Sequence, residues 1–348
     1  MKDWIDLGHR IANGMFSPHR LLVRTGLVLA ALGGGGIGFQ AVVGGVSFGL
    51  STGSPLTWLS VMLALSGVIM IAGGSIAALR NADRRRVFAL QVLGLRSVPD
   101  APLVNRVPAR LQGRREPWPL DLRDPLQDGM MIDPLAAANE IRTVPSGMRQ
   151  RANGRDPGDT SFVVAGLAPV PLLMLLGYEL DDEFEVTVMD WDRSKERWFE
   201  PARGGDTLAI ATEGLDEIEE GTREAAVSLS VSYGIRPEDV VRQIGDLPHV
   251  RIHMPHTSAK WRDEQEQIAQ TWFDALKTLQ ARGVDRVHLF VAAPASLAIQ
   301  LGRRYDWRNL PSARVYQYDR DAALPYPWSL ALPRPGEAPV VHHHSGAG

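Results

Sequence analysis

Residues 162–193 read FVVAGLAPVPLLMLLGYELDDEFEVTVMDWDR, and residues 288–320 read HLFVAAPASLAIQLGRRYDWRNLPSARVYQYDR. Each stretch contains an apolar run, a proline, a helical pattern with a glycine, a loop and a second apolar run that ends in Asp-Arg. The order of these features is the same in both, which indicates an internal duplication rather than coincidence. The shared landmarks are Pro169 and Pro294, Gly177 and Gly302, and the pairs Asp192-Arg193 and Asp319-Arg320.

Apolar runs and helical patterns alternate through the rest of this region. The clearest helix covers 264–283, where Ile268, Trp272 and Leu276 share one face and Gly283 marks the end. Strands separated by helices predict parallel units, so the predicted fold class is α/β. The predicted strands lie at 161–167, 184–189, 208–212, 225–231, 249–254, 286–292 and 313–318.

The proline in each repeat marks a turn from a strand into a helix. Proline suits the first helical turn, and the small residues beside Pro294 would let another group approach the backbone. Free N–H groups at a helix start favour an anion, and ligands of parallel sheets lie beyond the carboxyl ends of the strands. Two such units side by side would form a composite cleft. A tight packing corner explains the same residues, and the pattern leaves both explanations open.

The N-terminal part has a different composition. From Thr25 to Leu79 there is no Asp, Glu, Lys or Arg, and the window contains two apolar segments, 27–46 and 58–79. Each is about as long as the ~20 residues that a helix needs to cross a bilayer. Arginines flank the window on both sides, whereas the loop between the segments carries no charge. The sequence therefore predicts a two-helix transmembrane hairpin with both termini in the cytoplasm.

Glycines are concentrated in the first apolar segment. Gly34 and Gly38, and also Gly45 and Gly49, have the spacing that lets membrane helices pack closely. A merely flexible span is the alternative interpretation. A cleaved signal peptide would have a single, shorter apolar region, and an uncharged window of this length is rare in a soluble fold.

The connection between the membrane segments and the repeats is rich in proline and arginine. Residues 84–95 are compatible with a strand or with an extension of the second membrane helix. A helix is predicted at 133–144, with Asp133 as its cap and Pro134 in its first position. The histidines at 342–344 lie in a polar tail that we expect to be disordered.

The composition excludes several classes of function. The chain has 348 residues, no cysteine and a formal net charge of −3, so disulfides, thiolate chemistry and a bulk charge for binding DNA or RNA are not expected. His253 and His256 have no Asp or Glu at a spacing that would complete a metal site. Asp190 and Asp192 suit a solvated or capping role better than a catalytic pair. We therefore predict no metal, no cofactor and no catalytic residue.

The run HLFVAAPASLAIQLGRRY, followed by VYQYDR and PYPWSLAL, resembles the C-terminal signature of SAVED domains from bacterial CBASS antiphage systems. The resemblance to the domain covers roughly 84–333. Family members with two transmembrane helices ahead of the domain are a known arrangement, and this chain resembles them. It implies two fused CARF-like, Rossmann-type halves that bind a cyclic di- or trinucleotide made by a cGAS-like nucleotidyltransferase. Gln317 is a departure, because the family often has an acidic residue there.

Carried over to this sequence, the resemblance implies a ligand site formed by both repeats. Arginine can hold two phosphate oxygens, a hydroxyl in a first helical turn can meet a phosphate, and an aromatic ring can stack on a base. The implied ligand-binding residues are Ala168, Pro169, Arg193, Ser232, Lys260, Trp261, Pro294, Ala295, Ser296, Tyr318 and Arg320.

The whole sequence thus predicts a membrane-anchored receptor of the bacterial inner membrane that binds a cyclic oligonucleotide, self-associates and breaches the bilayer. The alternatives are a membrane-tethered nucleotide-processing enzyme and an inert membrane scaffold. The predicted domains are a cytoplasmic segment (1–24), the hairpin (25–80), a connecting region with the start of the soluble domain (81–160), the SAVED domain (161–333, with halves at about 161–232 and 249–333) and a disordered tail (334–348).

Overall fold

The computed structural model describes residues 24–25, 27, 41–43, 46–48, 57–95, 101–123, 126–127, 130–131, 133–180, 184–254 and 259–344. The chain forms two compact units, Met1–Arg85 and Arg86–Gly348, which are described separately below.

The first unit departs from the predicted hairpin of helices in one place. We expected a helix over 27–46, but the end of this span and the residues that follow it contain two short antiparallel strands, β1 (Ala41–Val43) and β2 (Val46–Phe48). The valines and the phenylalanine of these strands are residue types that favour a pleated strand. Most of the remainder of this predicted span lies outside the described residues.

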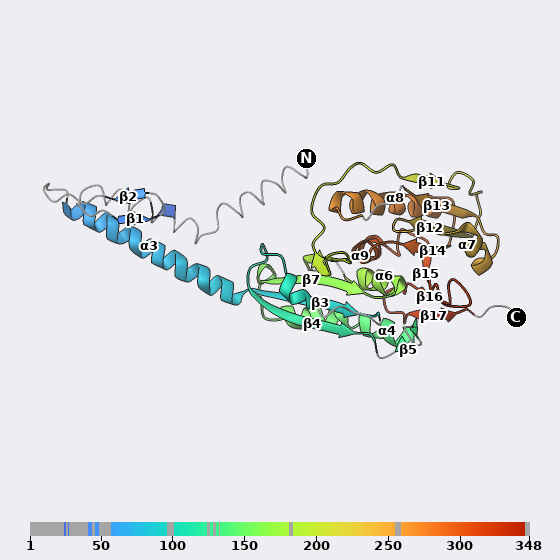
Figure 1. Ribbon diagram of the computed structural model, residues 1–348, viewed down its shortest axis with the longest axis horizontal. Coiled ribbons are helices and arrows are strands. Elements are labelled where there is room, and N and C mark those ends of the chain that lie inside the picture. The colour runs from blue at the N-terminus through green and yellow to red at the C-terminus, as the bar shows by residue number, and fades with distance from the viewer. Residues whose placement is uncertain are drawn as a thin grey trace. The chain divides into compact units, whose positions relative to one another are not determined.

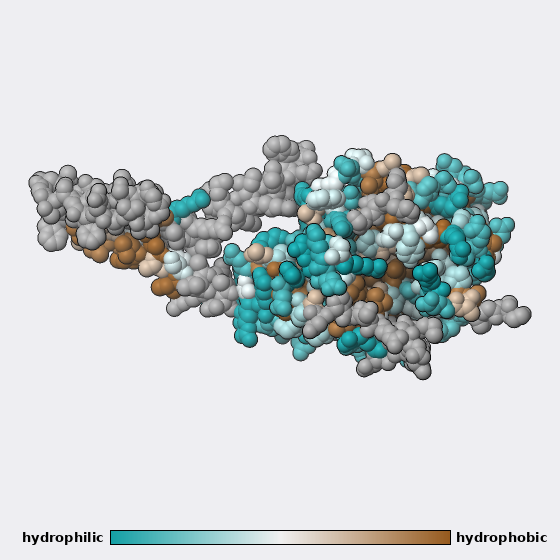
Figure 2. Space-filling view, viewed as in Figure 1, coloured by the Kyte–Doolittle hydropathy of each residue, from teal (hydrophilic) through white to brown (hydrophobic). Residues whose placement is uncertain are grey.

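The second predicted span, 58–79, lies within a single helix, α3 (Thr57–Arg84). Large apolar side chains are exposed along α3, and Figure 2 shows this apolar surface. Within the described part of the chain, no helix meets the combined length and hydropathy of a membrane span. The exposed apolar residues of α3 are Met62, Leu65, Val68, Ile69 and Ile76.

A four-stranded, fully parallel sheet begins the second unit, in the order β4-β3-β7-β8. Its strands are β3 (Arg86–Leu93), β4 (Arg114–Asp121), β7 (Thr160–Leu167) and β8 (Val186–Val188). Residues 84–95 thus provide a strand and not a helical extension, and 81–160 contributes half of this sheet instead of serving mainly as a connection. The run Val87–Leu90 is almost fully buried, which explains why these residues favour a central strand.

The other elements before residue 200 connect or cover this sheet. The helix predicted from Asp133 is confirmed as α4, because the Asp133 carboxylate accepts a hydrogen bond from the Ala136 N–H at 2.8 Å and Pro134 takes the first position. These elements are η1 (Leu103–Arg106), β5 (Leu126–Gln127), β6 (Met130–Met131), α4 (Pro134–Ile141), α5 (Val144–Ala152), η2 (Pro157–Asp159), α6 (Val170–Glu179), β9 (Asp190–Asp192) and β10 (Arg197–Phe199).

A seven-stranded sheet follows, in the order β11-β13-β12-β14-β15-β16-β17. Its central strands β13, β12, β14 and β15 are parallel, and the outer strands are antiparallel. The elements are β11 (Ala211–Glu213), β12 (Glu224–Ser230), α7 (Pro237–Ile244), β13 (His249–His253), α8 (Arg262–Ala281), β14 (Arg286–Ala292), α9 (Ala295–Arg304), β15 (Ser312–Gln317), β16 (Trp328–Ala331) and β17 (Val340–His343).

We call Arg86–Phe199 the first half and Ala211–His343 the second half. The predicted boundary at residue 232 is wrong, because β12 pairs with β13 and β14 in the second sheet. Both repeats nevertheless form a strand, a helix and an adjacent parallel strand, β7-α6-β8 and β14-α9-β15. The duplicated pattern therefore marks the centre of each half and not its limits.

The predicted disordered tail is also wrong over most of its length. Val340–His343 forms β17 and pairs antiparallel with β16, so that His343 lies opposite Trp328. The strand covers backbone groups of β16 that would otherwise form an open sheet edge. The ring of His344 stacks on Tyr316, and its Nε2 lies 2.9 Å from the Ser329 hydroxyl. Residues 345–348 lie outside the described part of the chain.

Helices α6 and α9 pack against each other at the centre of the second unit (Figure 1). Each also contacts the sheet of the other half, since α6 touches β15 and β16 while α9 touches β7 and β8. A Cβ on Gly177 would lie 1.9 Å from the Ile299 carbonyl oxygen, and one on Gly302 would lie 2.0 Å from that of Met174. The glycine that both repeats share is thus the residue that lets the two helices touch through their backbones.

A candidate ligand cleft between the two halves

A cleft of about 580 Å³ lies at the carboxyl ends of β7, β12 and β14. Both halves line it, as the duplicated strand-to-helix turns predicted. The first half supplies the end of β7, the start of α6 and the hairpin of β9 and β10. The second half supplies the turns after β12 and β14 and the residue before the Trp261 cap of α8.

The β9–β10 hairpin places an aromatic ring and a cation in the cleft. Trp191 pairs with Trp198 across the hairpin, and their ring centroids are 5.0 Å apart in an edge-to-face arrangement. Trp198 is 2% exposed and belongs to the core, whereas Trp191 is only partly buried and lines the cleft. The Asp192 carboxylate accepts hydrogen bonds from the backbone and hydroxyl of Ser194, so it caps the turn that holds Arg193.

Two exposed cations, Arg193 and Lys260, line the cleft from opposite halves. Neither makes an ion pair with any residue that the structure describes. The hydrogen bond from the Ser194 hydroxyl lowers the pKa of Asp192, and the positive charge of Lys260 adds to this effect. The carboxyl groups of Asp190 and Asp192 also line the cleft, so its charge is mixed. The two cations that no salt bridge neutralises are the groups that suit an anionic ligand.

One tyrosine, Tyr233, lines the side of the cleft that belongs to the second half, and two further tyrosines pack next to it. Tyr233 lies in the cleft and its ring is 5.8 Å from that of Tyr318, which in turn packs edge-on against Tyr326 at 5.7 Å. Burial raises the pKa of Tyr233, as does Tyr318, while the charge of Arg193 acts in the opposite direction. Tyr318 thus lies next to Tyr233 and outside the cleft lining, and Tyr233 is the tyrosine that lines the cleft.

The helix starts beside the cleft differ from our expectation. We expected free N–H groups there, but the Val170 N–H at the start of α6 donates to Oε1 of Gln317 at 3.0 Å. At the start of α9, the Ser296 hydroxyl donates to the Asp190 carboxylate at 2.9 Å. A side chain of the opposite half therefore already occupies each helix start.

Ser296 consequently has a structural position that the sequence analysis did not predict. It is fully buried, so its hydroxyl lies behind the cleft instead of meeting a phosphate. Asp190 is 6% exposed, which excludes the solvated role and leaves the capping role that we also considered. Burial raises the pKa of the Asp190 carboxyl, although hydrogen bonds from Trp191 and Ser296 oppose the rise.

The structure brings some of the predicted ligand residues together and places others outside. Trp261 lies against Gly204, Ser296 is behind the wall, and Arg320 is in an exposed bend. The predicted residues that line the cleft are Ala168, Arg193, Ser232, Lys260, Pro294 and Ala295. Those outside the lining are Pro169, which caps α6, and Trp261, Ser296, Tyr318 and Arg320.

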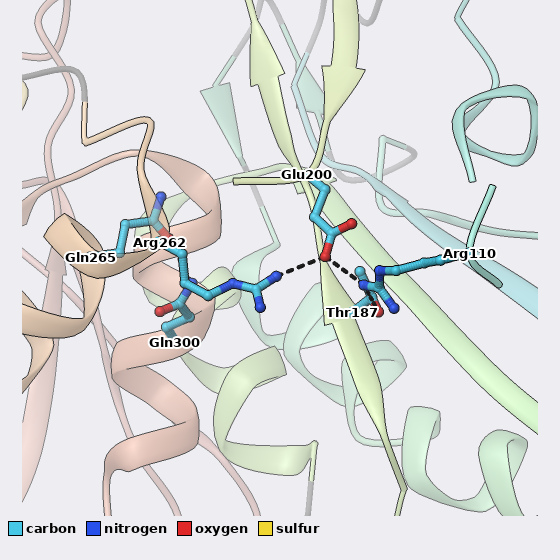
Figure 3. Close-up of polar contacts among 6 residues, drawn as sticks. All are labelled: Arg110, Thr187, Glu200, Arg262, Gln265 and Gln300. Atoms are coloured by element: carbon cyan, nitrogen blue, oxygen red, sulfur yellow. Dashed lines mark hydrogen bonds and ion pairs between the residues drawn. The ribbon is translucent and has the colours of Figure 1, made fainter. Parts of the chain in front are cut away.

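An ion-pair network joins the halves near the cleft (Figure 3). One carboxylate oxygen of Glu200 accepts hydrogen bonds from Arg110 at 2.5 Å and from Arg262 at 2.7 Å. Arg110 also donates to the Thr187 hydroxyl at 3.2 Å. Figure 3 shows the two arginines reaching Glu200 from opposite sides, so this carboxylate ties the first half to the start of α8.

Two aromatic lining residues, Trp191 and Tyr233, are not in the predicted ligand-binding set, although the sequence analysis considered Trp191 as a ring that could stack on a base. Trp191 aligns with Tyr318 in the duplicated repeat, and this match could have paired them. Tyr233 follows β12, which we had assigned to the wrong half. Among the described residues, no group of three His, Asp or Glu side chains could hold a metal ion.

The second unit is an α/β domain that is built from two similar halves with a cleft between them and that follows an apolar helix in the chain. Residues 144–332 match the family model described as "SMODS-associated and fused to various effectors sensor domain", and the chain belongs to this SAVED family. Residues 15–138 match a second model, the "SAVED-fused 2TM effector domain". The resemblance found in the sequence is thereby confirmed.

Several solved structures have a similar fold. The Acinetobacter baumannii Cap4 SAVED/CARF-domain containing receptor with 3′3′3′-cAAA is 12% identical, with a TM-score of 0.45, and the alignment covers 78% of this chain and 58% of that one. The same receptor with 2′3′3′-cAAA is 13% identical, with a TM-score of 0.47, and the alignment covers 78% of this chain and 58% of that one. The Moraxella osloensis Cap4 SAVED/CARF-domain containing receptor is 14% identical, with a TM-score of 0.45, and the alignment covers 76% of this chain and 56% of that one. This chain thus spans less than two thirds of their length, and no curated protein matches it.

Proposed function

We propose that the cleft binds a cyclic di- or trinucleotide made by a cGAS-like nucleotidyltransferase, and that the chain is a receptor and effector of antiphage defence. The observation that carries this proposal is the pair of cations, Arg193 and Lys260, which face the cleft without an ion-pair partner among the described residues. Membership of a sensor-domain family supports it.

The aromatic residues suit the bases of such a ligand. Trp191 lies on one wall and Tyr233 on the other, and stacking on an aromatic ring contributes ~1–3 kcal/mol per base. The cations suit the phosphates, because a charged donor and a phosphate form a strong hydrogen bond. The ring of a cyclic oligonucleotide carries both groups, so it matches the cleft better than an apolar metabolite or a simple sugar.

The N-terminal region is proposed to anchor the protein in the bacterial inner membrane as a two-pass hairpin with both termini in the cytoplasm. The uncharged window Thr25–Leu79, its arginine flanks and the match to a 2TM effector domain support this topology. The apolar side chains exposed on α3 would find their natural environment in lipid.

Ligand binding is proposed to cause self-association of the sensor domains and disruption of the membrane by the clustered hairpins. A shared bilayer raises the effective concentration of the helices, so weak contacts between small residues become sufficient. The glycine spacing at Gly34 and Gly38 supports this step. No DNA or RNA partner is proposed.

The direct test is a titration of the full chain, purified in detergent, with a panel of cyclic di- and trinucleotides that includes 3′3′3′-cAAA. We expect one or more members to bind with one ligand per cleft. Arg193→Ala and Lys260→Ala should each weaken binding roughly ten- to a hundredfold, because each loses a charged hydrogen bond of ~1.5–3 kcal/mol.

The control variant is Lys195→Ala, which removes a neighbouring exposed cation that does not line the cleft. Equal affinity in the wild type and in both cleft variants would contradict the proposed site. Conversion of a bound member of the panel into a linear product would indicate the alternative, a nucleotide-processing enzyme. Failure of every member to bind would leave the scaffold alternative.

A further inference from the structure

Two hydrogen bonds cross between the halves at the base of the cleft, one in each direction. Oε1 of Gln317, at the end of β15 in the second half, accepts the N–H of Val170 in the first turn of α6. The carboxylate of Asp190, at the start of β9 in the first half, accepts the hydroxyl of Ser296 in the first turn of α9. Each half therefore binds the first turn of the other half's central helix, through a backbone N–H in α6 and through a side-chain hydroxyl in α9.

The two capping residues are equivalent in the duplicated sequence. The repeats align on the pairs that begin with Asp192 and Asp319, and the residues two positions earlier are Asp190 and Gln317. Both helices cross at the glycine contacts described above, so the same pseudo-symmetry relates the helices and the caps. The reciprocity follows from the duplication, and it does not depend on a chance contact of one side chain.

The cap on α9 continues through a buried chain of hydrogen bonds to the cleft. Nε2 of Gln265 donates to the Ser296 hydroxyl at 2.8 Å and to the Ala259 carbonyl at 2.7 Å. Oε1 of Gln265 accepts from Gln300 at 2.6 Å, so this amide is fully satisfied. Ala259 has a φ of 43°, a conformation that a residue with a Cβ adopts only when its surroundings fix it.

The residue after Ala259 is Lys260, one of the two cleft cations. The chain from Asp190 through Ser296 and Gln265 therefore fixes the backbone on which Lys260 stands. All three of these side chains are buried, and a buried polar network with every member satisfied is rigid. Gln317 directly precedes Tyr318, and its Nε2 donates a hydrogen bond to the Tyr318 carbonyl oxygen. The residue that binds the start of α6 is thereby connected with the tyrosines beside the cleft.

We propose that Asp190 and Gln317 are positioning residues of the cleft. They hold the two halves in register by binding the first turns of α6 and α9, so that the phosphates of a bound ligand meet the side chains of Arg193 and Lys260. The part that concerns phosphates rests on the proposed function, whereas the reciprocal caps do not. A neutral amide serves one helix and a buried carboxyl serves the other.

The test is amide hydrogen exchange of the full chain in detergent at single-residue resolution. Gln317→Leu removes the acceptor at similar size, and Gln317→Glu keeps it. We expect Gln317→Leu to speed exchange of Val170 by roughly two- to thirtyfold, the usual effect of losing one helix cap. Gln317→Glu should leave this exchange near that of the wild type, and the start of α9 should change in neither variant.

The reverse pattern is expected for the other cap. Asp190→Leu should speed exchange at the start of α9 and leave Val170 unchanged, while Asp190→Asn, which keeps an acceptor oxygen, should have a smaller effect. Ser296→Ala provides a milder variant, should Asp190→Leu not fold. Unchanged exchange of Val170 in Gln317→Leu, or simultaneous loosening of both helix starts in every variant, would overturn the reciprocal caps.

A second measurement tests whether the contacts of Asp190 and Gln317 affect ligand binding. Each variant is titrated with the members of the cyclic-oligonucleotide panel that bind the wild type. Gln317→Leu and Ser296→Ala should bind about two- to thirtyfold more weakly, in proportion to the exchange effect. Wild-type affinity in both would show that the caps do not position the cleft. If no member of the panel binds the wild type, the proposed function fails, while the exchange measurement still decides the caps.

Discussion

Replacing Gly302 by alanine should separate the two central helices and destabilise the second unit. The new Cβ would lie 2.0 Å from the Met174 carbonyl oxygen and 2.9 Å from the Tyr178 nitrogen. Contacts of this kind need at least about 3 Å, so α6 and α9 must move apart by roughly 1 Å. Both obstructing atoms belong to the backbone and cannot rotate away.

The magnitude follows from two opposing effects. In an unobstructed helix, alanine in place of glycine stabilises by about 0.5–1 kcal/mol, whereas overpacking a core typically costs ~1–3 kcal/mol or more. Because the obstruction is backbone, we expect a net loss of ~1–3 kcal/mol. For a unit of this size, that is a fall in Tm of roughly 2–12 °C. Thermal unfolding of the full chain, followed by tryptophan fluorescence, measures it.

The matched control is Gly158→Ala, since a Cβ at Gly158 meets no atom within 4 Å. Its Tm should equal or slightly exceed that of the wild type. Gly177→Ala should behave like Gly302→Ala, and the double variant should lose less than the sum, because helices already apart tolerate the second Cβ. A Gly302→Ala protein as stable as the wild type would refute the backbone contact on which this reasoning depends.

Three further predictions address pH, topology and the membrane. Burial, with help from a nearby arginine, lowers the pKa of His249 to about 4, below its ordinary value of 6.5, so the unfolded state takes up the proton first. The stability that His249 contributes is therefore complete above about pH 6.5 and is lost as the pH falls towards 4. The variant His249→Gln lacks this titration, so its Tm should fall less than that of the wild type over the same pH range. An identical fall in Tm would contradict the assignment. In the cysteine-free chain, a cysteine at Ser51 should react with an impermeant thiol reagent from outside and one at Ser97 should not, whereas the reverse pattern would contradict the topology. Full chain in liposomes should release dye only with a binding member of the panel, and replacing Gly34 and Gly38 by leucine should block release without altering binding; equal release without ligand would contradict the mechanism.

The sequence predicted the strand-to-helix units because local rules determine them. The apolar runs form β7, β12, β13, β14 and β15, and the proline turns form the starts of α6 and α9. Each of these elements follows from its own hydrophobic periodicity and from the proline or glycine residues at its ends. Ala168, Pro294 and Ala295, at these turns, line the cleft for the same reason. The alternation of strands and helices suggested a parallel sheet whose ligand lies beyond the carboxyl ends of its strands.

The boundaries of the halves depended on pairing that the sequence does not encode locally. β12 is a continuous buried run like β7, and only its neighbours β13 and β14 place it in the second sheet. β3 follows α3 after a single residue, so its apolar run could not be separated from the preceding helix by composition. The histidines of β17 are polar, and their strand exists because β16 offers an edge.

The site could be predicted only in part, because side-chain partners are a property of the assembled halves. Arg193 and Lys260 were expected in the cleft, and they line it. Ser296 was expected to face a phosphate, yet its hydroxyl is satisfied by Asp190 across the interface between the halves. That contact joins residues more than a hundred positions apart, which no local motif indicates.

The most direct test of the central claim is a footprint of the ligand on the full chain. Hydrogen exchange is measured with and without the members of the cyclic-oligonucleotide panel. The account predicts protection of the β9–β10 turn at Arg193, of the turn at Tyr233 and of the segment at Lys260, from both halves together. Protection confined to a separate groove lined by Trp307, Arg308 and Arg334, or no protection by any member, would contradict it.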